Sequence, residues 1–378
     1  MNLNGSTQHD CGVAATAAMT IGIAGAGLLG RLLAWRLGRA GHRVSVFDPA
    51  LSEAPAFDGR QAAGFSAAGM LSPLAELDTS SAQVAVLGWR SIALWRDIVA
   101  RMVTPPHFRA EGSLLLAHRS DLGAAQRVLA RLASAPAGTP AASPLTLAAL
   151  AQLEPALQGA AHAWLLPDEA QIDPLGAMHS LHAEATGVRW HWNRRVTQVD
   201  AGSLTLDDGS RQRFDLVFDV RGTGSRPELP VRGVRGETAW LHAPGHGLTR
   251  PVRLLHPRHR VYLVPRPGDI VLVGASEIES EDRSPVSVRS AVELMSAAHS
   301  VLPALAEARI HRLDVNLRPA LPDNEPQVEV SEGRVRINGL FRHGWLIAPA
   351  LVEDALRECG LAPQPDPTTS FKPEAIHG

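Results

Sequence analysis

A glycine-rich turn between two short apolar runs constrains the fold of this chain more than any other feature. Residues 20–30 read Thr-Ile-Gly-Ile-Ala-Gly-Ala-Gly-Leu-Leu-Gly. Residues 20–24 are predicted as a buried strand, and Gly25, Gly27 and Gly30 have the spacing at which such a strand turns into a closely packed helix. The first backbone N–H groups of that helix favour an anion. The pattern therefore predicts a bound dinucleotide with its pyrophosphate at this turn.

The residues that follow complete the unit. Leucines at helical spacing from Leu28 to Leu37 predict an apolar helix that Gly38 and Gly41 end. Residues 44–48 are predicted as a second strand ending in Asp48, whose carboxylate can accept a hydrogen bond from an adenosine ribose hydroxyl. This order of elements favours a dinucleotide site over a glycine turn without a ligand, and it leaves FAD and NAD both open.

Composition limits the class of protein. The 378 residues suffice for two intertwined domains, and the net charge of -2 argues against a nucleic-acid-binding protein. No apolar run reaches the ~20 residues of a membrane span, and the start of the chain lacks a secretory signal. Cys11 and Cys359 match no disulfide or metal spacing, so we expect a cytoplasmic protein without a bound metal. Residues 1–18 are expected to be a disordered leader, and residues 361–378 a flexible tail.

Hydrophobic periodicity predicts helices over residues 81–102, 121–133, 175–186 and 286–301. Strands are predicted over 188–192, 195–199, 204–206 and 214–220, followed by an antiparallel set over 237–243, 252–255, 261–265 and 270–274. Two more strands, 311–317 and 334–339, precede a C-terminal helix that begins within 341–350. Residues 57–73 show neither period and 135–144 are predicted as a linker. The turn Gly222-Thr-Gly224 is either a second phosphate-side element or an ordinary β-turn.

Several segments together resemble the FAD-dependent D-amino-acid oxidase family, and within it the glycine oxidases of thiamine (thiazole) biosynthesis. The resemblance spans about residues 20–357, and the order and spacing of its motifs are more specific than any single motif. The motifs are the N-terminal glycine fingerprint, Ala67-Ala-Gly-Met-Leu71 with Glu76, Tyr262-Leu-Val-Pro-Arg266 with Val273-Gly-Ala275, Leu317-Arg-Pro319 with Pro322-Asp323, and Arg342-His-Gly-Trp-Leu-Ile-Ala-Pro349.

The resemblance implies an α/β fold with FAD as the cofactor. A Rossmann-like FAD-binding domain would be assembled from the discontinuous segments 19–90, 150–235 and 318–360, and an antiparallel-sheet substrate domain from 91–149 and 236–317. The cofactor-binding residues implied in this way are Gly25, Ala26, Gly27, Leu28, Leu29, Gly30, Asp48, Ser66, Ala67, Ala68, Gly69, Met70, Leu71, Val196, Gly222, Arg342, His343, Gly344, Trp345, Leu346 and Ile347. Arg221 before Gly222, and the bulky Trp345, depart from the family's usual pattern.

On the substrate side the resemblance implies two catalytic-site residues. Arg318 matches the arginine that binds a substrate carboxylate, for which a guanidinium is well shaped. Tyr262 matches a tyrosine whose hydroxyl could contact the same carboxylate. Without the family pattern, an arginine before a proline is most often a surface or ion-pair residue, and a tyrosine in a strand is most often part of the core.

The activity implied is oxidation of glycine or a small amino acid to an imine and then a keto acid, with dioxygen reduced to hydrogen peroxide. The expected partners are a small amino acid and dioxygen, with no nucleic acid and no membrane span, and the related oxidases are often homo-oligomers. Two alternatives stay open: a dehydrogenase that passes electrons to a quinone, and a flavin-binding module that is non-catalytic or acts on a macromolecule.

Overall fold

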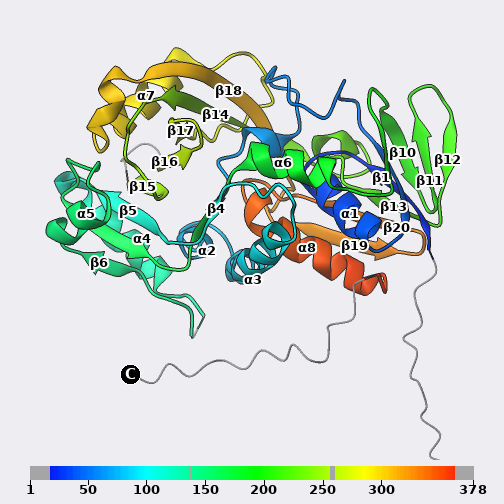
Figure 1. Cartoon of the computed structure of the whole chain (residues 1–378), viewed down its shortest axis with the longest axis horizontal. Helices are drawn as coiled ribbons and strands as arrows, with labels where there is room; N and C mark the ends of the chain where they lie inside the picture. Colours follow the sequence, from blue (N-terminus) through cyan, green and yellow to red (C-terminus); the bar gives the residue numbers. More distant parts are fainter. Residues whose placement is uncertain (1–17, 137, 256–259, 362–378) are drawn as a thin grey trace, which may run out of the picture.

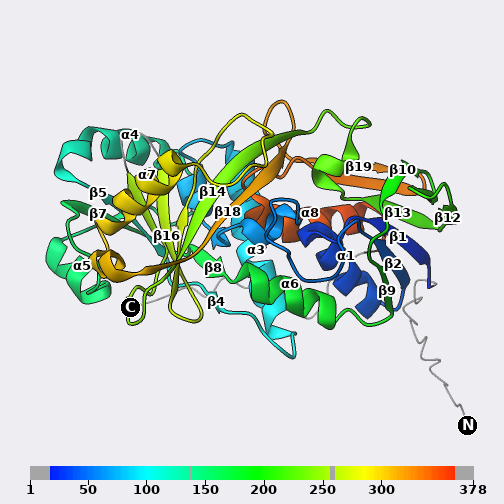
Figure 2. The same ribbon diagram turned by 90° about the horizontal axis from the view of Figure 1, so that it is seen from above.

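The computed structural model describes residues 18–136, 138–255 and 260–361. The predicted leader and tail lie outside the described residues, apart from Ala18 and Leu361. The described chain contains two large β-sheets at opposite ends of an elongated molecule, as Figures 1 and 2 show. One is mostly parallel and the other mostly antiparallel, which confirms the predicted α/β fold class with a Rossmann-like part.

The first sheet has six strands in the order β19-β20-β13-β1-β2-β9. Its neighbours are parallel except for β19 and β20. The strands are β1 (Thr20–Ala24), β2 (Arg43–Phe47), β9 (Val188–His191), β13 (Leu216–Asp219), β19 (Gln327–Ser331) and β20 (Arg334–Asn338). Because β1 is flanked by β2 and β13, the glycine turn after β1 opens at the carboxyl ends of parallel strands, where α/β sheets bind their ligands.

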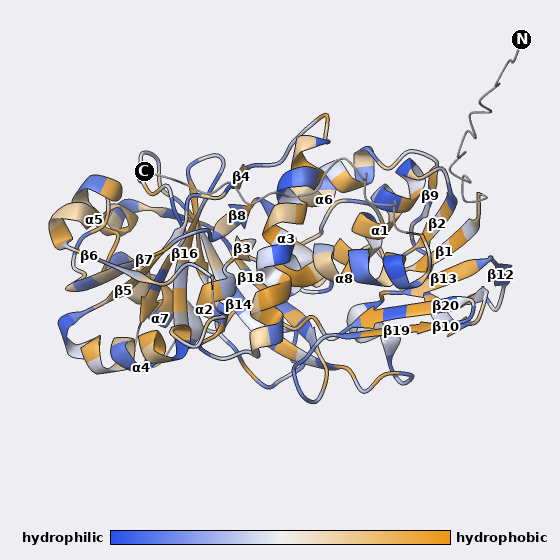
Figure 3. Ribbon diagram, turned by 90° about the horizontal axis from the view of Figure 1, so that it is seen from below, coloured by the Kyte–Doolittle hydropathy of each residue, from blue (hydrophilic) through white to orange (hydrophobic). Residues whose placement is uncertain are grey.

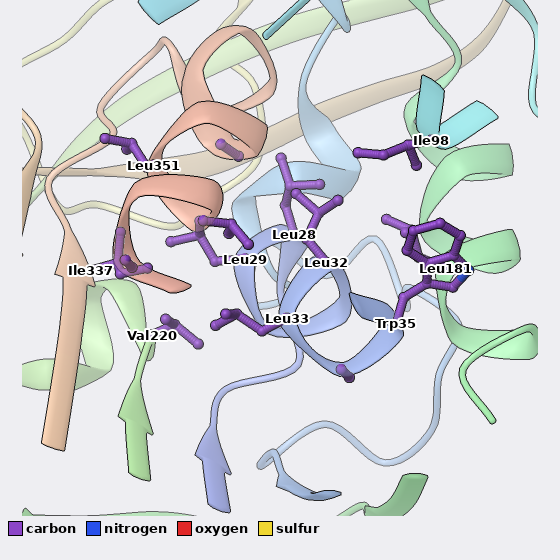
Figure 4. Close-up of a cluster of buried hydrophobic side chains, with 14 of the residues drawn as sticks. Leu28, Leu29, Leu32, Leu33, Trp35, Ile98, Leu181, Val220, Ile337 and Leu351 are labelled. Atoms are coloured by element: carbon purple, nitrogen blue, oxygen red, sulfur yellow. The ribbon is translucent and has the colours of Figure 1, made fainter. Parts of the chain in front are cut away.

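Helix α1 (Leu28–Arg39) follows that turn and supplies much of the core. Leu32, Leu33 and Trp35 are buried, and their neighbours come from helices α6 (Pro174–Ala183) and α8 (Gly344–Glu358), as Figure 4 shows. Burial of each such side chain stabilises the fold by roughly 1.5–3 kcal/mol. Helix α3 (Ala82–Ala100) packs against α8, where the rings of Trp95 and Trp345 stack 5.4 Å apart. This packing fixes the position of the first turn of α8.

The second sheet has eight strands in the order β18-β14-β17-β16-β15-β5-β7-β6. All neighbouring pairs are antiparallel except β15 and β5. The strands are β5 (Ser113–Ala117), β6 (Ser143–Leu145), β7 (His162–Leu166), β14 (Arg232–His242), β15 (Val252–Leu255), β16 (Arg260–Arg266), β17 (Ile270–Gly274) and β18 (Arg309–Ala320).

The two faces of this sheet have different roles. Helix α7 (Val288–His299) covers one face, where Leu294 packs against strand residues such as Leu241 and Leu263. Tyr262 and Trp240 alternate with those residues and point to the opposite face. Helices α4 (Leu122–Leu132) and α5 (Leu147–Leu153) lie at the far end of the sheet. Apolar residues concentrate along the strands of both sheets, as Figure 3 shows.

Short elements connect these parts. Two small antiparallel sheets have the orders β10-β11-β12 and β3-β8-β4. Their strands are β10 (Val196–Asp200), β11 (Ser203–Leu206), β12 (Arg211–Arg213), β3 (Met70–Leu71), β8 (Ala170–Ile172) and β4 (Phe108–Arg109). The remaining elements are α2 (Pro73–Glu76) and four 3₁₀ turns, η1 (Ala63–Ser66), η2 (Arg119–Asp121), η3 (Gly222–Ser225) and η4 (Pro303–Glu307).

Some predicted boundaries are corrected by the structure. Residues 57–73, predicted without regular structure, contain η1 and β3, because β3 pairs with β8 far along the chain. The predicted linker 135–144 ends inside β6. Strand β7 lies in the segment 150–235 assigned to the FAD-binding domain, yet it pairs with β5 in the eight-stranded sheet. The other domain boundaries stay a prediction.

Candidate functional site

A cavity of about 1030 Å³ reaches from the glycine turn to the eight-stranded sheet. Of the residues implied by the family motifs, those that line it are Gly25, Gly27, Leu28, Leu29, Asp48, Ser66, Ala67, Ala68, Gly69, Met70, Val196, Gly222, Tyr262, Arg318, Arg342, His343, Gly344, Trp345 and Leu346. The fold thus brings together residues from distant parts of the chain. Four implied residues do not line the cavity: Ala26, Gly30, Leu71 and Ile347.

These four residues support the wall from behind. Leu71 and Ile347 are fully buried in the apolar core. A Cβ on Gly30 would overlap the carbonyl oxygen of Gly25, so Gly30 allows α1 to pack closely on the turn. The backbone N–H of Ala26 donates to Asp48 Oδ2 at 2.7 Å. Their role in a cofactor site stays a prediction, and their positions favour support of the wall over direct contact.

The glycine turn has the shape that a dinucleotide pyrophosphate needs. Gly25 has φ +107°, and a Cβ there would lie 2.7 Å from the carbonyl oxygen of Val220. Helix α1 begins after Gly27 without a side-chain cap and without an acidic residue in its first turn. Its first N–H groups and its dipole are therefore free to favour an anion in the cavity. The residues present fit the diphosphate of a dinucleotide.

Asp48 stands at the end of β2 and lines the cavity. Its two carboxylate oxygens accept hydrogen bonds from the backbone N–H groups of Ala26, at 2.7 Å, and Ala50, at 2.8 Å. A carboxylate oxygen can accept more than one hydrogen bond, so Asp48 keeps capacity for a ribose hydroxyl. The turn Gly222-Thr-Gly224 also lines the cavity as part of η3, which favours its interpretation as a second phosphate-side element.

The N-terminus of α8 opens on the cavity. His343, Gly344 and Trp345 line the cavity, and the His343 side chain does not cap the helix. The Trp345 indole donates a hydrogen bond to the carbonyl oxygen of Gly64, 3.0 Å away, and so holds the 57–73 segment against α8. An uncapped helix N-terminus stabilises negative charge placed before it. This end of the cavity suits a group that becomes anionic during reaction.

One face of the eight-stranded sheet forms the opposite wall. Arg253, Tyr262 and Gly274 are direct cross-strand neighbours on β15, β16 and β17, so they share this face. A Cβ on Gly274 would overlap the phenol of Tyr262, and a Cβ on Gly236 would overlap the guanidinium of Arg318. The two glycines therefore leave the space in which the tyrosine and arginine side chains lie.

The half-buried Arg318 guanidinium has only main-chain partners among the described residues. It donates from Nη1 to the carbonyl oxygen of Arg235 at 3.3 Å and from Nη2 to that of Ser276 at 3.1 Å. Burial lowers the pKa of Arg318, whereas Tyr262 and Glu277 raise it. Burial also raises the pKa of Tyr262, so its hydroxyl keeps its proton as a donor. A guanidinium without a carboxylate partner is suited to bind one from a ligand.

Glu76, at the end of α2, holds a cluster of buried cations. Its carboxylate pairs with Arg342 Nη2 at 2.7 Å and with Arg253 Nη2 at 2.9 Å, and His343 Nδ1 lies 3.3 Å away. Burial alone would raise the pKa of Glu76, yet Arg342, His343 and Arg253 together hold it well below its usual range. Burial, reinforced by the two arginines, lowers the pKa of His343 to about 4. The cluster is thus an ionised glutamate, two arginines and a neutral histidine.

Sequence reasoning missed several cavity residues, and the charged side chains of Arg253 and Glu277 are the two that bear most on the Arg318 site. Arg253 interrupts the apolar strand Val252–Leu255, and that single charge in a buried strand was an available signal. Glu277 follows β17 in an irregular segment and has no local signal. Its Oε2 lies 3.4 Å from Arg342 Nη1, and its side chain is 49% exposed.

Neither a metal centre nor a membrane span is found in the described ranges. No group of three or more His, Cys, Asp or Glu side chains in residues 18–136, 138–255 and 260–361 could hold a metal ion. In the same part of the chain, every helix is too short or too polar to cross a bilayer.

The chain is similar to several known proteins. The family model described as DAO, FAD dependent oxidoreductase, matches residues 20–354. The "Putative thiamine biosynthesis oxidoreductase ThiO" of Rhizobium etli is 37% identical over 342 residues, which cover 90% of this chain and 96% of that protein. Two crystal structures share the fold. Glycine oxidase from Geobacillus kaustophilus has a TM-score of 0.76 at 22% identity, covering 96% of this chain and 100% of its own. Iminodiacetate oxidase from Chelativorans has a TM-score of 0.75 at 24% identity, covering 93% and 98%.

Proposed function

The chain belongs to the DAO family of FAD-dependent oxidoreductases and uses FAD, and from this premise we propose that it oxidises glycine or a similarly small amino acid. The bond oxidised joins the α-carbon to the amine, and the imine formed hydrolyses to a keto acid and ammonia. Dioxygen is the proposed electron acceptor, with hydrogen peroxide as its product. The ThiO relative and the glycine oxidase fold support this choice.

One observation carries the proposal: Arg318 points into the cavity without a carboxylate partner among the described residues. A guanidinium offers two parallel N–H donors, which match the two oxygens of an amino-acid carboxylate. Tyr262 stands on the same face with its proton in place, so its hydroxyl can donate to the same carboxylate. Together they would fix the substrate by its carboxylate and leave the α-carbon directed along the cavity.

The cofactor and the chain would divide the work. When bound, FAD supplies an acceptor for the hydride that leaves the α-carbon. The glycine turn with Asp48 would hold the adenosine diphosphate part of FAD, and the segment from Ser66 to Met70 would approach its isoalloxazine ring. The uncapped N-terminus of α8, with Arg342 beside it, would stabilise negative charge at the ring's pyrimidine end.

The biological setting is part of the same proposal. A glycine oxidase related to ThiO would supply an imine for thiazole synthesis in thiamine formation, and we place the enzyme in the cytoplasm. Self-association into a homo-oligomer is expected by analogy with related oxidases, and oligomeric state can be measured by light scattering.

The test is an anaerobic titration of the FAD-loaded protein with glycine, sarcosine and a panel of D- and L-amino acids. We expect glycine or a small relative to bleach the visible flavin band, and air to restore the band with one peroxide per turnover. Bleaching without recovery in air, but with rapid dye reduction, would identify a dehydrogenase instead. Absence of bleaching by every amino acid would overturn the proposal.

A further inference from the structure

Glu277 is a half-exposed acidic side chain that lines the cavity and acts electrostatically on Arg318. It follows Ser276, whose carbonyl oxygen accepts a hydrogen bond from Arg318 Nη2, and it contacts Arg342 on its other side. Glu277, Arg318 and Arg342 all line the cavity, and Glu277 is close enough to Arg318 to raise the pKa of that guanidinium. With 49% of its side chain exposed and a single contact at 3.4 Å, Glu277 is loosely held.

Glu76, the other acid in this part of the cavity, is more deeply buried and more firmly held. It is 8% exposed, and two arginines and a histidine surround its carboxylate. Because these partners already occupy its carboxylate, Glu76 is not available to interact with a ligand. The negative charge of Glu277, in contrast, faces the cavity and acts on the group that binds there.

The charges of this cluster can be counted. Within the group formed by Arg318, Glu277 and the Glu76 cluster, Arg253, Arg318 and Arg342 carry three positive charges and Glu76 and Glu277 two negative ones, which leaves this group with one positive charge in excess. A ligand with one carboxylate neutralises that excess. A ligand with two carboxylates would place an unpaired negative charge beside Glu277, and like charges at short distance repel each other.

We infer that Glu277 is a specificity-determining residue that admits amino acids with one carboxylate and rejects amines with two, such as N-carboxymethyl or acidic amino acids. Rejection by a like charge is a common means of selecting among similar ligands. This inference rests on the proposed function, because it takes the carboxylate site at Arg318 as given.

The experiment measures binding of two unreactive probes, acetate and malonate, to the FAD-loaded protein through the change they cause in flavin absorption. Wild type is compared with Glu277→Gln, which removes the charge and keeps the shape. The matched control is Glu279→Gln, two residues along the same segment, where the glutamate pairs with Arg232 outside the cavity. Arg342 keeps its contact with Glu76 in the variant, so the fold and the bound FAD should persist.

We expect Glu277→Gln to tighten malonate about tenfold and acetate by less than about threefold, since a dianion gains more from loss of a neighbouring negative charge. Glu279→Gln should change neither. An unchanged ratio of malonate to acetate affinity in Glu277→Gln overturns the inference. A separate Arg318→Ala variant locates the carboxylate site: if it binds acetate as tightly as wild type, the proposed function fails and the inference falls with it.

Discussion

The substitution Gly236→Ala tests the Arg318 site without altering the arginine itself. A Cβ at residue 236 would overlap Nη1, Nη2 and Cζ of Arg318. The overlapping atoms are the end of a flexible side chain, so the guanidinium should move aside while the sheet keeps its structure. Gly236 does not have a positive φ, and alanine is therefore compatible with its backbone.

The expected magnitude follows from the contact that is lost. A hydrogen bond to a charged group contributes about 1.5–3 kcal/mol, and a displaced fork loses at least one of its two bonds to a carboxylate. A loss of about 2 kcal/mol corresponds to a roughly 30-fold weaker dissociation constant. FAD binding and thermal stability should remain close to wild type, because neither depends on where the guanidinium lies.

The assay is acetate binding, followed by flavin absorption, together with anaerobic reduction by glycine. The control is Gly123→Ala on α4, where the nearest atom to an added Cβ is 3.8 Å away. Wild-type acetate affinity in Gly236→Ala would refute the reasoning, because the guanidinium displaced by the methyl group could not then be the carboxylate site. Loss of FAD would also refute it, by showing that the change spreads beyond Arg318.

Three further changes test other parts of the cavity. Glu76→Gln removes the charge that Arg342 and Arg253 share and leaves Arg342, among the described residues, only its 3.4 Å ion pair with Glu277, so it should destabilise the protein by up to about 3–5 kcal/mol, measured by chemical denaturation. An unchanged denaturation midpoint would mean that the Glu76 cluster does not stabilise the fold. Burial holds the pKa of His343 at about 4 in the folded protein, below the value of about 6.5 in an unfolded chain. As the pH falls from about 6.5 to 4, the unfolded chain binds a proton that the folded protein does not bind, so wild-type stability should decline. His343→Asn should remove up to about 3 kcal/mol of that decline. Identical stability profiles against pH for wild type and His343→Asn would show that the decline does not come from His343. Gly25→Ala should lose FAD on gel filtration and keep its far-UV circular dichroism, since the added Cβ would meet the carbonyl oxygen of Val220; retention of FAD would show that the turn is not the diphosphate site.

The first unit of the fold could be predicted because its determinants are local. The glycine spacing, the leucines of α1 and the final Asp48 all lie within one short stretch, and the structure confirms the strand, helix and second strand. Strands β5 and β7 were not predicted. Residues 113–117 are buried throughout, so they show no alternation, and β5 pairs with β15, which is distant in sequence. A short apolar run of this kind does not reveal its type or its partner.

The candidate site was harder to predict than the first unit of the fold, because its determinants are not local. Arg318 and Tyr262 were reached through family motifs, because neither has a local pattern that separates it from a surface arginine or a core tyrosine. The cluster around Glu76 could not be predicted from spacing, since its partners come from β15 and from the start of α8 and meet only in the folded chain. Charged networks of this kind are set by topology, and the sequence shows only their separate members.

The two strand glycines connect the fold to the site. Glycine inside a strand is destabilising by roughly 0.5–1 kcal/mol relative to alanine. Gly236 lies inside β14 and Gly274 is the last residue of β17, and both are on the cavity face of the sheet. Each stands where a Cβ would overlap a side chain expected to contact the substrate, Arg318 in one case and Tyr262 in the other. Space on this face is thus kept for polar groups that a ligand can reach, instead of being filled by cross-strand packing. We therefore expect substitution of Gly236 or Gly274 to weaken ligand binding before it weakens the fold.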